Sequence, residues 1–247
     1  MATITIDKTQ YETELVIFDK DGTLLDFKDT WIDIIKELIS AIGKRVSMND
    51  TLHKRIETAL GIFPEERRID GYGPLAMGTF QECDALLTHC VYREGLRWDK
   101  AQTIVQKAEK EIFSGAVREQ SVRAAKGAID LLKKLKAKGI NTAVATNDSA
   151  DDATQDMRRI GALPYIDLIV GADSVSKPKP APDMVLEICE KLAKSPSNAV
   201  LIGDTLMDAL LGKNAGVMLT IGVSGVLTPD ILIEHTDVVI DSLTEIA

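Results

Sequence analysis

The stretch "LVIFDKDGTLLD", residues 15–26, decides the fold of this chain. Its four apolar residues, 15–18, run directly into Asp19, Lys20 and Asp21. A continuous apolar run of this kind is typical of a strand that is buried on both faces of a parallel sheet. Two carboxylates at the end of such a strand are costly unless something balances their charge. Positive charge is therefore expected beside these carboxylates.

After residue 124, apolar runs of strand length alternate with amphipathic segments of helix length. This alternation predicts an α/β fold, a doubly wound, Rossmann-like parallel sheet covered by helices on both faces. The last run, residues 236–243, is predicted as an edge strand. The expected strands are 140–146, 166–172, 199–204 and 218–223, and the expected helices are 127–139, 149–161, 181–194 and 206–216.

The region between residues 27 and 117 has a different pattern, with amphipathic helical segments and hardly a strand among them. Because this region interrupts an α/β domain after its first strand, it indicates an inserted all-helical domain. We therefore expect an α/β core of residues 1–25 and 118–247, and an inserted helical domain of residues 26–117. The expected helices of the insert are 30–46, 49–62, 79–95 and 99–115.

The composition limits the classes of binding partner that the protein can have. The 247 residues carry a net charge of −9, which disfavours binding to nucleic acid or to anionic membranes. No apolar run approaches the roughly 18 residues that span a membrane, and the first residues lack a basic segment followed by an apolar one. The 3 cysteines have no CxxC spacing, as expected for reduced thiols. We expect a cytoplasmic protein, either a monomer or a homodimer.

Polar residues follow several of the predicted strands. Asp19 ends the first strand, Thr146 and Asn147 end the second, and Asp204 follows the run "AVLIG". The carboxyl ends of parallel strands lie at one edge of a sheet, where such folds bind ligands. Asp208 follows Asp204 by one helical turn and can face the same place. The sequence therefore predicts one site built from distant residues.

A divalent cation would explain the acidic residues of this site. Asp19 and Asp21 are two positions apart, so an extended chain directs both side chains to one side and Lys20 to the other. Carboxylates this close repel one another unless a cation lies among them, and Mg²⁺ prefers oxygen ligands. Roles as helix caps or turn residues explain one aspartate but not three at converging strand ends. The predicted metal ligands are Asp19, Asp21, Asp204 and Asp208.

Four short motifs contain these residues or lie near them. In chain order they are "DKDGT" (19–23), "AVATND" (143–148), "KPAPD" (179–183) and "GDTLMD" (203–208). Together they resemble the motifs of the haloacid dehalogenase superfamily, specifically its Mg²⁺-dependent phosphatases of the phosphoglycolate phosphatase and β-phosphoglucomutase branch. The resemblance covers residues 15–25 and 124–220.

This resemblance implies a role for each motif. Asp19 would be the nucleophile that forms an aspartyl-phosphate, and Asp21 the general acid and later the general base. Lys179 would balance charge, although "SKPKPAPD" also offers Lys177. Lys20 is expected to point away from the carboxylates. The residues expected to bind the phosphoryl group are Thr146 and Asn147, with Gly22 and Thr23 in the turn after Asp19.

The resemblance implies Mg²⁺-dependent hydrolysis of a small phosphate monoester, phosphoglycolate-like or a sugar phosphate, with the helical insert as a cap that selects the phosphorylated metabolite. Three alternatives stay open. A sugar-phosphate mutase uses the same core but transfers the phosphoryl group to a second substrate. A phosphonate hydrolase would need a lysine that forms a Schiff base. A non-catalytic phosphate-binding module would be expected to lack the nucleophile or the lysine.

Overall fold

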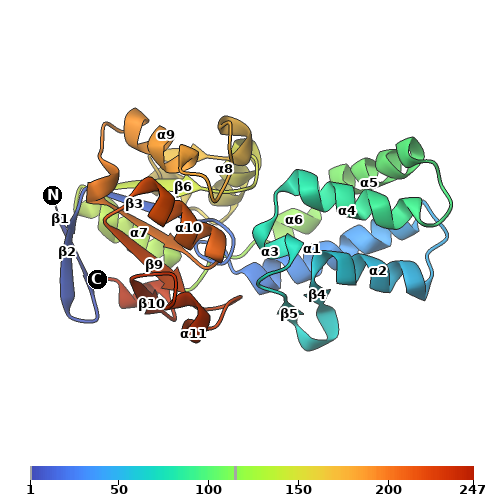
Figure 1. The fold of residues 1–247 in the computed structure, drawn as a ribbon, viewed down its shortest axis with the longest axis horizontal. Helices are drawn as coiled ribbons and strands as arrows, with labels where there is room; N and C mark the ends of the chain where they lie inside the picture. The colour runs from blue at the N-terminus through green and yellow to red at the C-terminus, as the bar shows by residue number, and fades with distance from the viewer. Residues whose placement is uncertain (1, 114–115) are drawn as a thin grey trace. The chain divides into compact units, whose positions relative to one another are not determined.

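The computed structural model describes residues 2–113 and 116–247. The chain divides into two compact units, shown in Figure 1. The first contains the chain up to Phe27 and again Arg123–Ala247, and the second is Lys28–Val122. The second boundary lies after Val122 rather than after residue 117, because helix α6 (Ala116–Ser121) belongs to the second unit. The last two residues of the helix predicted over 99–115 lie outside the described residues.

A 6-stranded sheet forms the centre of the first unit, in the order β10-β9-β8-β3-β6-β7. Every pairing in it is parallel, which confirms the predicted fold class. The central strand β3 is buried along its whole length between β6 and β8, and β10 lies at an edge, as predicted. The strands are β3 (Leu15–Phe18), β6 (Asn141–Ala145), β7 (Leu168–Val170), β8 (Ala199–Gly203), β9 (Leu219–Val223) and β10 (Val238–Ile240).

Helices lie on both faces of this sheet. Leu15 and Ile17 of β3 pack with Val185 and Ile188 of α9 and with Leu211 of α10 in one buried cluster. In Figure 1, α10 lies in front of the sheet and α7 behind it. The helices of this unit are α7 (Ala128–Ala137), α8 (Ala150–Arg159), α9 (Asp183–Lys191), α10 (Leu206–Ala215) and α11 (Pro229–Leu232), with short 3₁₀ turns η2 (Leu163–Tyr165), η3 (Ala172–Ser174), η4 (Pro196–Asn198) and η5 (Leu243–Glu245).

An N-terminal hairpin, β1 (Ala2–Ile6) and β2 (Thr9–Thr13), was not predicted. Its two-residue turn places Asp7 and Lys8 at φ 43° and 67°, as a type I′ hairpin turn requires. The turn lacks the Asn-Gly or Asp-Gly pair that marks such hairpins in a sequence. The main chain of Thr5 exchanges two hydrogen bonds with that of Ala247, at 2.9 and 3.0 Å, which fixes the hairpin to the C-terminus.

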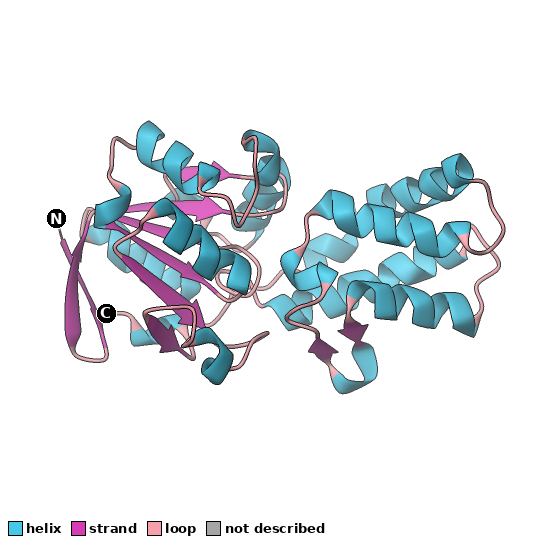
Figure 2. Cartoon of the chain, viewed as in Figure 1, coloured by secondary structure: helices cyan, strands magenta, loops and turns pink. Residues whose placement is uncertain are grey.

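The second unit is almost entirely helical (Figure 2). Helix α2 begins at the N-cap Asn49, and α4 begins with a capping box of Thr79 and Glu82. No helix of the described residues is both long enough and apolar enough to cross a membrane. The elements are α1 (Phe27–Gly43), α2 (Asp50–Leu60), β4 (Ile62–Phe63), η1 (Pro64–Glu66), β5 (Arg68–Ile69), α3 (Pro74–Met77), α4 (Phe80–Tyr92), α5 (Trp98–Phe113) and α6.

One carboxyl group is buried between helices of this unit. Glu109 of α5 is 6% exposed, and burial, together with the carboxylate of Asp84 on α4, raises its pKa to about 7. The folded protein therefore binds this proton more tightly than the unfolded chain does. The stability that this proton contributes is complete below the unfolded pKa of 4.5 and is lost as the pH rises to about 7.

We predict that Glu109→Gln stabilises the protein more at pH 8 than at pH 5, by on the order of 1–3 kcal/mol, because the amide carries no charge to bury. Urea unfolding of the variant and of the wild type at both pH values measures the difference. Glu111→Gln is the control on the same helix. Hydrogen bonding from Arg45 lowers the pKa of Glu111, so this substitution should not stabilise at pH 8. An equal effect of Glu109→Gln at both pH values would contradict the prediction.

Candidate active site

The site lies where the chain reverses direction across the sheet. From β3 the chain passes to β6 and β7 on one side, and then to β8 and β9 on the other. Strands β3 and β8 are neighbours, so Asp19 and Asp204, which directly follow them, lie at this topological switch point. The amide of Asp19 donates to the carbonyl of Ile202, 2.8 Å away, and holds the end of β3 beside β8.

A tight turn follows Asp19. The amides of Leu24 and Leu25 both donate to the carbonyl of Lys20, at 3.0 and 2.8 Å, and Gly22 has φ +93°. A Cβ atom on Gly22 would lie 1.9 Å from Oδ2 of Asp204, closer than any contact allows. The positive φ and the close approach both require glycine at this position. The turn therefore brings main chain directly against the carboxylate of Asp204.

Three buried carboxylates meet at this edge. Asp19, Asp204 and Asp208 each place one oxygen within 4.8 Å of the other two, and they are 9%, 1% and 2% exposed. Both oxygens of Asp204 are buried, and neither has a hydrogen-bond partner among the described residues. Buried carboxylates without partners are costly, and hard divalent cations prefer carboxylate oxygens. The donor set therefore fits a cation bound by Asp204 and Asp19.

The electrostatics of the cluster agree with this interpretation. Burial, opposed by Lys179 and reinforced by Asp208, raises the pKa of Asp19 to about 7. Burial, followed by the charge of Asp19, raises the pKa of Asp204 well above its ordinary value. The ionised form of both carboxyl groups is disfavoured in this arrangement, so positive charge beyond that of Lys179 would stabilise both anions.

Lys179 is the cation already present in the cluster. Its Nζ lies 2.5 Å from Oδ1 of Asp19 and 2.6 Å from Oδ1 of Asp208. Burial opposes the charge of this ammonium group, but the two carboxylates outweigh burial and raise the pKa of Lys179. Lys177 is exposed. The geometry thus distinguishes the two lysines that the sequence left open, and it assigns Lys179 to the cluster.

Asp208, predicted as a metal ligand, has its carboxylate engaged by protein groups. Its Oδ1 pairs with Lys179, and its Oδ2 accepts from the amide and the hydroxyl of Thr205, at 3.1 and 2.6 Å. This arrangement suits a residue that holds Lys179 in position better than one that binds the cation directly. Thr205 was not identified from the sequence, although its place at the start of α10, three residues before Asp208, is typical of a capping residue.

Thr146 and Asn147 follow β6 at the same edge. Thr146 is 3% exposed, and its Oγ1 accepts from the amide of Asp148 at 3.1 Å. Oδ1 of Asn147 accepts from the amide of Lys179 at 3.1 Å, so the Asn147 side chain fixes the main chain at the lysine. The structure therefore brings Asp19, Asp204, Asp208 and the Thr146–Asn147 loop to one edge of the sheet, together with Lys179, which the motif resemblance had named.

Lys20 and Asp21 do not point to opposite sides, as the alternation of side chains in a strand had predicted. The strand ends at Phe18, so the alternation of side chains does not continue through the turn. The side chain of Asp21 is not part of the three-carboxylate cluster. Instead, Lys20 is fully buried, and its Nζ lies 2.6 Å from Oδ2 of Asp21. The expectation that Lys20 points away from the carboxylates is therefore wrong.

Gly22 and Thr23 also differ from a simple phosphate-binding turn. The amide of Gly22 donates to the carbonyl of Leu25 at 2.9 Å, so it is used within the turn. Thr23 is fully buried, and its hydroxyl has no hydrogen-bond partner among the described residues. The function of Gly22 in the fold is thus to admit Asp204, rather than to offer an amide to phosphate.

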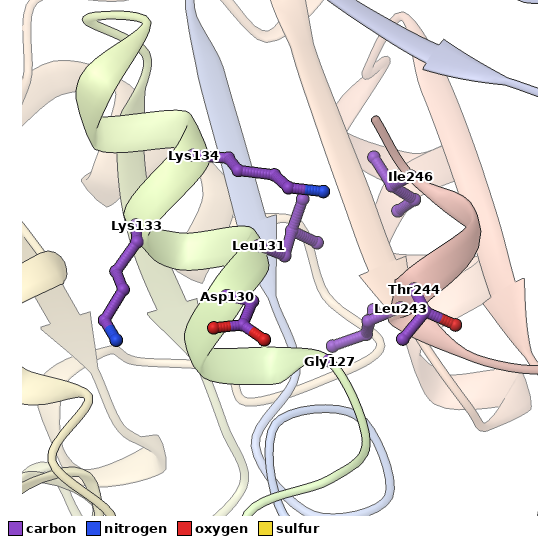
Figure 3. A pocket seen from close by; sticks show the side chains of 8 residues that line it. All are labelled: Gly127, Asp130, Leu131, Lys133, Lys134, Leu243, Thr244 and Ile246. Carbon is purple, nitrogen blue, oxygen red and sulfur yellow. The ribbon is translucent and has the colours of Figure 1, made fainter.

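A separate pocket of about 380 Å³ lies between α7 and η5 (Figure 3). Asp130, Leu131 and Lys134 line it from α7, and Leu243 and Thr244 line it from η5. None of the residues that line it belongs to the acidic cluster or to the motifs. The pocket is therefore not the candidate active site.

The parallel sheet has a buried charged cluster at its carboxyl edge, the place where α/β folds bind ligands. The profile of the haloacid dehalogenase-like hydrolases matches residues 13–216. The chain belongs to this family, which confirms the resemblance found in the four motifs.

Individual relatives agree with this assignment. The chain is 31% identical over 242 residues to the probable phosphatase IndB of Dickeya dadantii, covering 94% of this chain and 91% of that protein. It is 29% identical to a phosphoglycolate phosphatase of Psychrobacter arcticus, covering 86% of this chain and 84% of that protein. A predicted phosphoglycolate phosphatase of Haemophilus somnus has the same fold, with a TM-score of 0.70 at 18% identity over 94% of this chain and 96% of that chain.

We predict that Asp204→Asn raises the melting temperature of the metal-free protein at pH 8, because the substitution removes a buried carboxylate whose oxygens accept no hydrogen bond from the described residues. The same substitution should abolish the rise in melting temperature that MgCl₂ causes. In the wild type, a cation at about 100 times its Kd adds roughly 2.7 kcal/mol. Differential scanning calorimetry with and without MgCl₂ measures both effects.

Asp151→Asn, at an exposed position in the first turn of α8, is the matched control: it should not raise the melting temperature of the metal-free protein and should retain the full shift with MgCl₂. An Asp204→Asn variant that retained the full shift with MgCl₂ would contradict the assignment of the cation to this cluster.

Proposed function

We propose that the protein is a Mg²⁺-dependent phosphatase that hydrolyses small phosphate monoesters through an aspartyl-phosphate on Asp19. One observation supports the proposal above the others: Lys179 holds Oδ1 of Asp19 at 2.5 Å, beside the buried carboxylate of Asp204, which has no hydrogen-bond partner in the part of the chain that the structure describes. This combination provides a fixed nucleophile, a neutralising ammonium group and carboxylate oxygens for a cation. Phosphoryl transfer requires chiefly these elements of positioning and charge neutralisation.

In the first step, a carboxylate oxygen of Asp19 attacks phosphorus, and the bond between phosphorus and the ester oxygen breaks. The ester oxygen leaves with the bonding electron pair and takes a proton from Asp21. In the second step, Asp21 removes a proton from water while the water oxygen attacks phosphorus. Inorganic phosphate leaves and the Asp19 carboxylate is restored, so Asp21 regains its proton and the cycle is balanced.

The remaining residues stabilise the transferring group. Mg²⁺, held by Asp19 and Asp204, would supply positive charge against the phosphoryl oxygens. Lys179 keeps a positive charge beside Asp19, and Asp208 holds that lysine in place. Thr146 retains a hydroxyl hydrogen that can be donated to a phosphoryl oxygen, because its oxygen acts as the acceptor in the bond from Asp148.

The substrate class is proposed from the relatives and from the charge of the chain. The curated relatives include a protein named phosphoglycolate phosphatase, which favours a small phosphorylated metabolite of the phosphoglycolate or sugar phosphate class. The net charge of −9 disfavours polyanionic partners such as nucleic acid. We further propose that the helical unit acts as a cap that selects the leaving group, and that the protein works in the cytoplasm as a monomer or a homodimer.

A panel of phosphate esters, ranked by kcat/KM with MgCl₂ and with a chelator, tests the proposal. We predict hydrolysis of p-nitrophenyl phosphate that stops in the chelator, and a reduction of at least about 10³-fold in Asp19→Asn, because that variant lacks the nucleophile. Circular dichroism verifies that the variant is folded. Substantial residual turnover by a folded Asp19→Asn variant would contradict the role of Asp19.

The two lysines of "SKPKPAPD" provide a matched pair. We predict that Lys179→Met lowers kcat by about 10²–10³-fold, because the ammonium group no longer balances Asp19 and the phosphoryl group. Lys177→Met removes an exposed side chain of the same type and should leave kcat within about twofold. Equal effects of the two substitutions on p-nitrophenyl phosphate hydrolysis would disprove the assignment.

Sugar-phosphate mutase chemistry shares the first step and differs in the acceptor of the phosphoryl group. Product analysis with a hexose phosphate distinguishes the two functions. Release of inorganic phosphate in proportion to the substrate consumed supports the phosphatase, and an isomeric sugar phosphate without net release of phosphate supports the mutase.

A further inference from the structure

Lys20 has an unusual environment. The residue is 0% exposed, and its Nζ contacts three carboxylates: Asp21 at 2.6 Å, Asp148 at 3.3 Å and Asp156 at 3.1 Å. An ammonium group has three hydrogens, and carboxylate oxygens can accept each of them. Burying such a group is costly unless it is fully paired. The chain provides the three acids from three different segments.

Two of these acids anchor the lysine outside the turn. Asp156 lies on α8, is 1% exposed, and accepts from Arg159 at 2.9 Å through its other oxygen. Asp148 lies in the loop after β6, where its Oδ1 accepts from the amide of Ser149 at 3.0 Å. The amide of Asp148 in turn donates to Oγ1 of Thr146. Lys20 therefore joins the turn after β3 to the loop that carries Thr146.

The main chain of Lys20 is fixed as well. Its carbonyl accepts from the amides of Leu24 and Leu25, the two bonds that close the turn. Both ends of the residue are thus held, and the contact at 2.6 Å fixes Oδ2 of Asp21 relative to a rigid frame. A side chain held in this way loses little further freedom when a substrate binds.

We propose that Lys20 is a positioning residue for Asp21, the acid and base of the proposed function on which this inference rests. The ammonium group engages Oδ2 of Asp21 and so fixes the carboxyl group that exchanges the proton with the ester oxygen and with water. Stability alone does not require a lysine here, because replacing a buried ionic group and its partners with apolar side chains is often neutral or stabilising. The ionic arrangement instead determines where the Asp21 carboxylate lies.

A double-mutant cycle between Lys20 and Asp21 tests the proposal. The variants are Lys20→Met, Asp21→Asn and the double variant, assayed with MgCl₂ on the alkyl phosphate that the wild type hydrolyses fastest. Lys20→Met should lower kcat by about 10–100-fold, because a misplaced catalytic group loses about that much, and should leave KM within about threefold. In the Asp21→Asn background, the same substitution should change kcat by less than about twofold.

A control variant tests whether Lys20 affects kcat only by stabilising the local structure. Arg159→Gln removes the partly exposed side chain that pairs with Oδ1 of Asp156, without removing a group that contacts Asp21, and it should leave kcat unchanged. Should Lys20→Met fail to fold, the cycle is run with Asp156→Asn, which removes one of the three carboxylates and retains the ammonium group. A smaller loss in kcat, about 3–10-fold, is then expected, and it too must vanish in the Asp21→Asn background.

If Lys20→Met lowers kcat by the same factor with and without the Asp21 carboxylate, the two substitutions act independently. That result would overturn the inference and leave the proposed function intact. A wild-type protein that hydrolyses no ester of the panel would instead contradict the proposed function, and the inference would fall with it.

Discussion

The site depends on one ion-pair arrangement: the ammonium group of Lys179 between the carboxylates of Asp19 and Asp208, beside the buried carboxylate of Asp204. One positive charge cannot neutralise three carboxylates, and burial, reinforced by the neighbouring carboxylates, raises the pKa values of Asp19 and Asp204. A bound cation would offset the excess negative charge in the free protein. The phosphoryl group of a substrate would then approach a site of balanced charge. The arrangement that is unfavourable for the empty protein is the one that phosphoryl transfer requires.

The topology of the sheet makes this arrangement possible. Strands β3 and β8 are far apart in the sequence and adjacent in space, and each ends in an aspartate at the point where the strand order reverses. Gly22 completes the site, because only a residue without a Cβ atom allows the turn to approach Asp204. The parallel sheet brings Asp19 and Asp204 to the same edge, and the turn after Asp19 allows the main chain to lie against Asp204.

Much of this could be predicted from the sequence, for identifiable reasons. Strand runs and their terminal polar residues are local patterns, so the sheet and the convergence of Asp19, Thr146, Asn147 and Asp204 followed from them. The orientation of Lys20 did not, because the side-chain alternation of a strand does not hold in the turn that begins after Phe18. One signal was available: Asp156 shares the buried face of α8 with Ala153 and Met157, where a charge requires a partner. The choice between Lys177 and Lys179 needed tertiary contacts, since both lie in one irregular loop.

The central claim, that Asp19 and Asp204 hold a cation beside Lys179, is tested most directly by a crystal structure of the protein with MgCl₂ and a phosphate mimic. The account predicts one cation bonded to carboxylate oxygens of both Asp19 and Asp204, with Lys179 still beside Asp19 and the mimic aligned with its carboxylate. A structure in which the mimic is bound while the oxygens of Asp204 contact no cation would contradict the account.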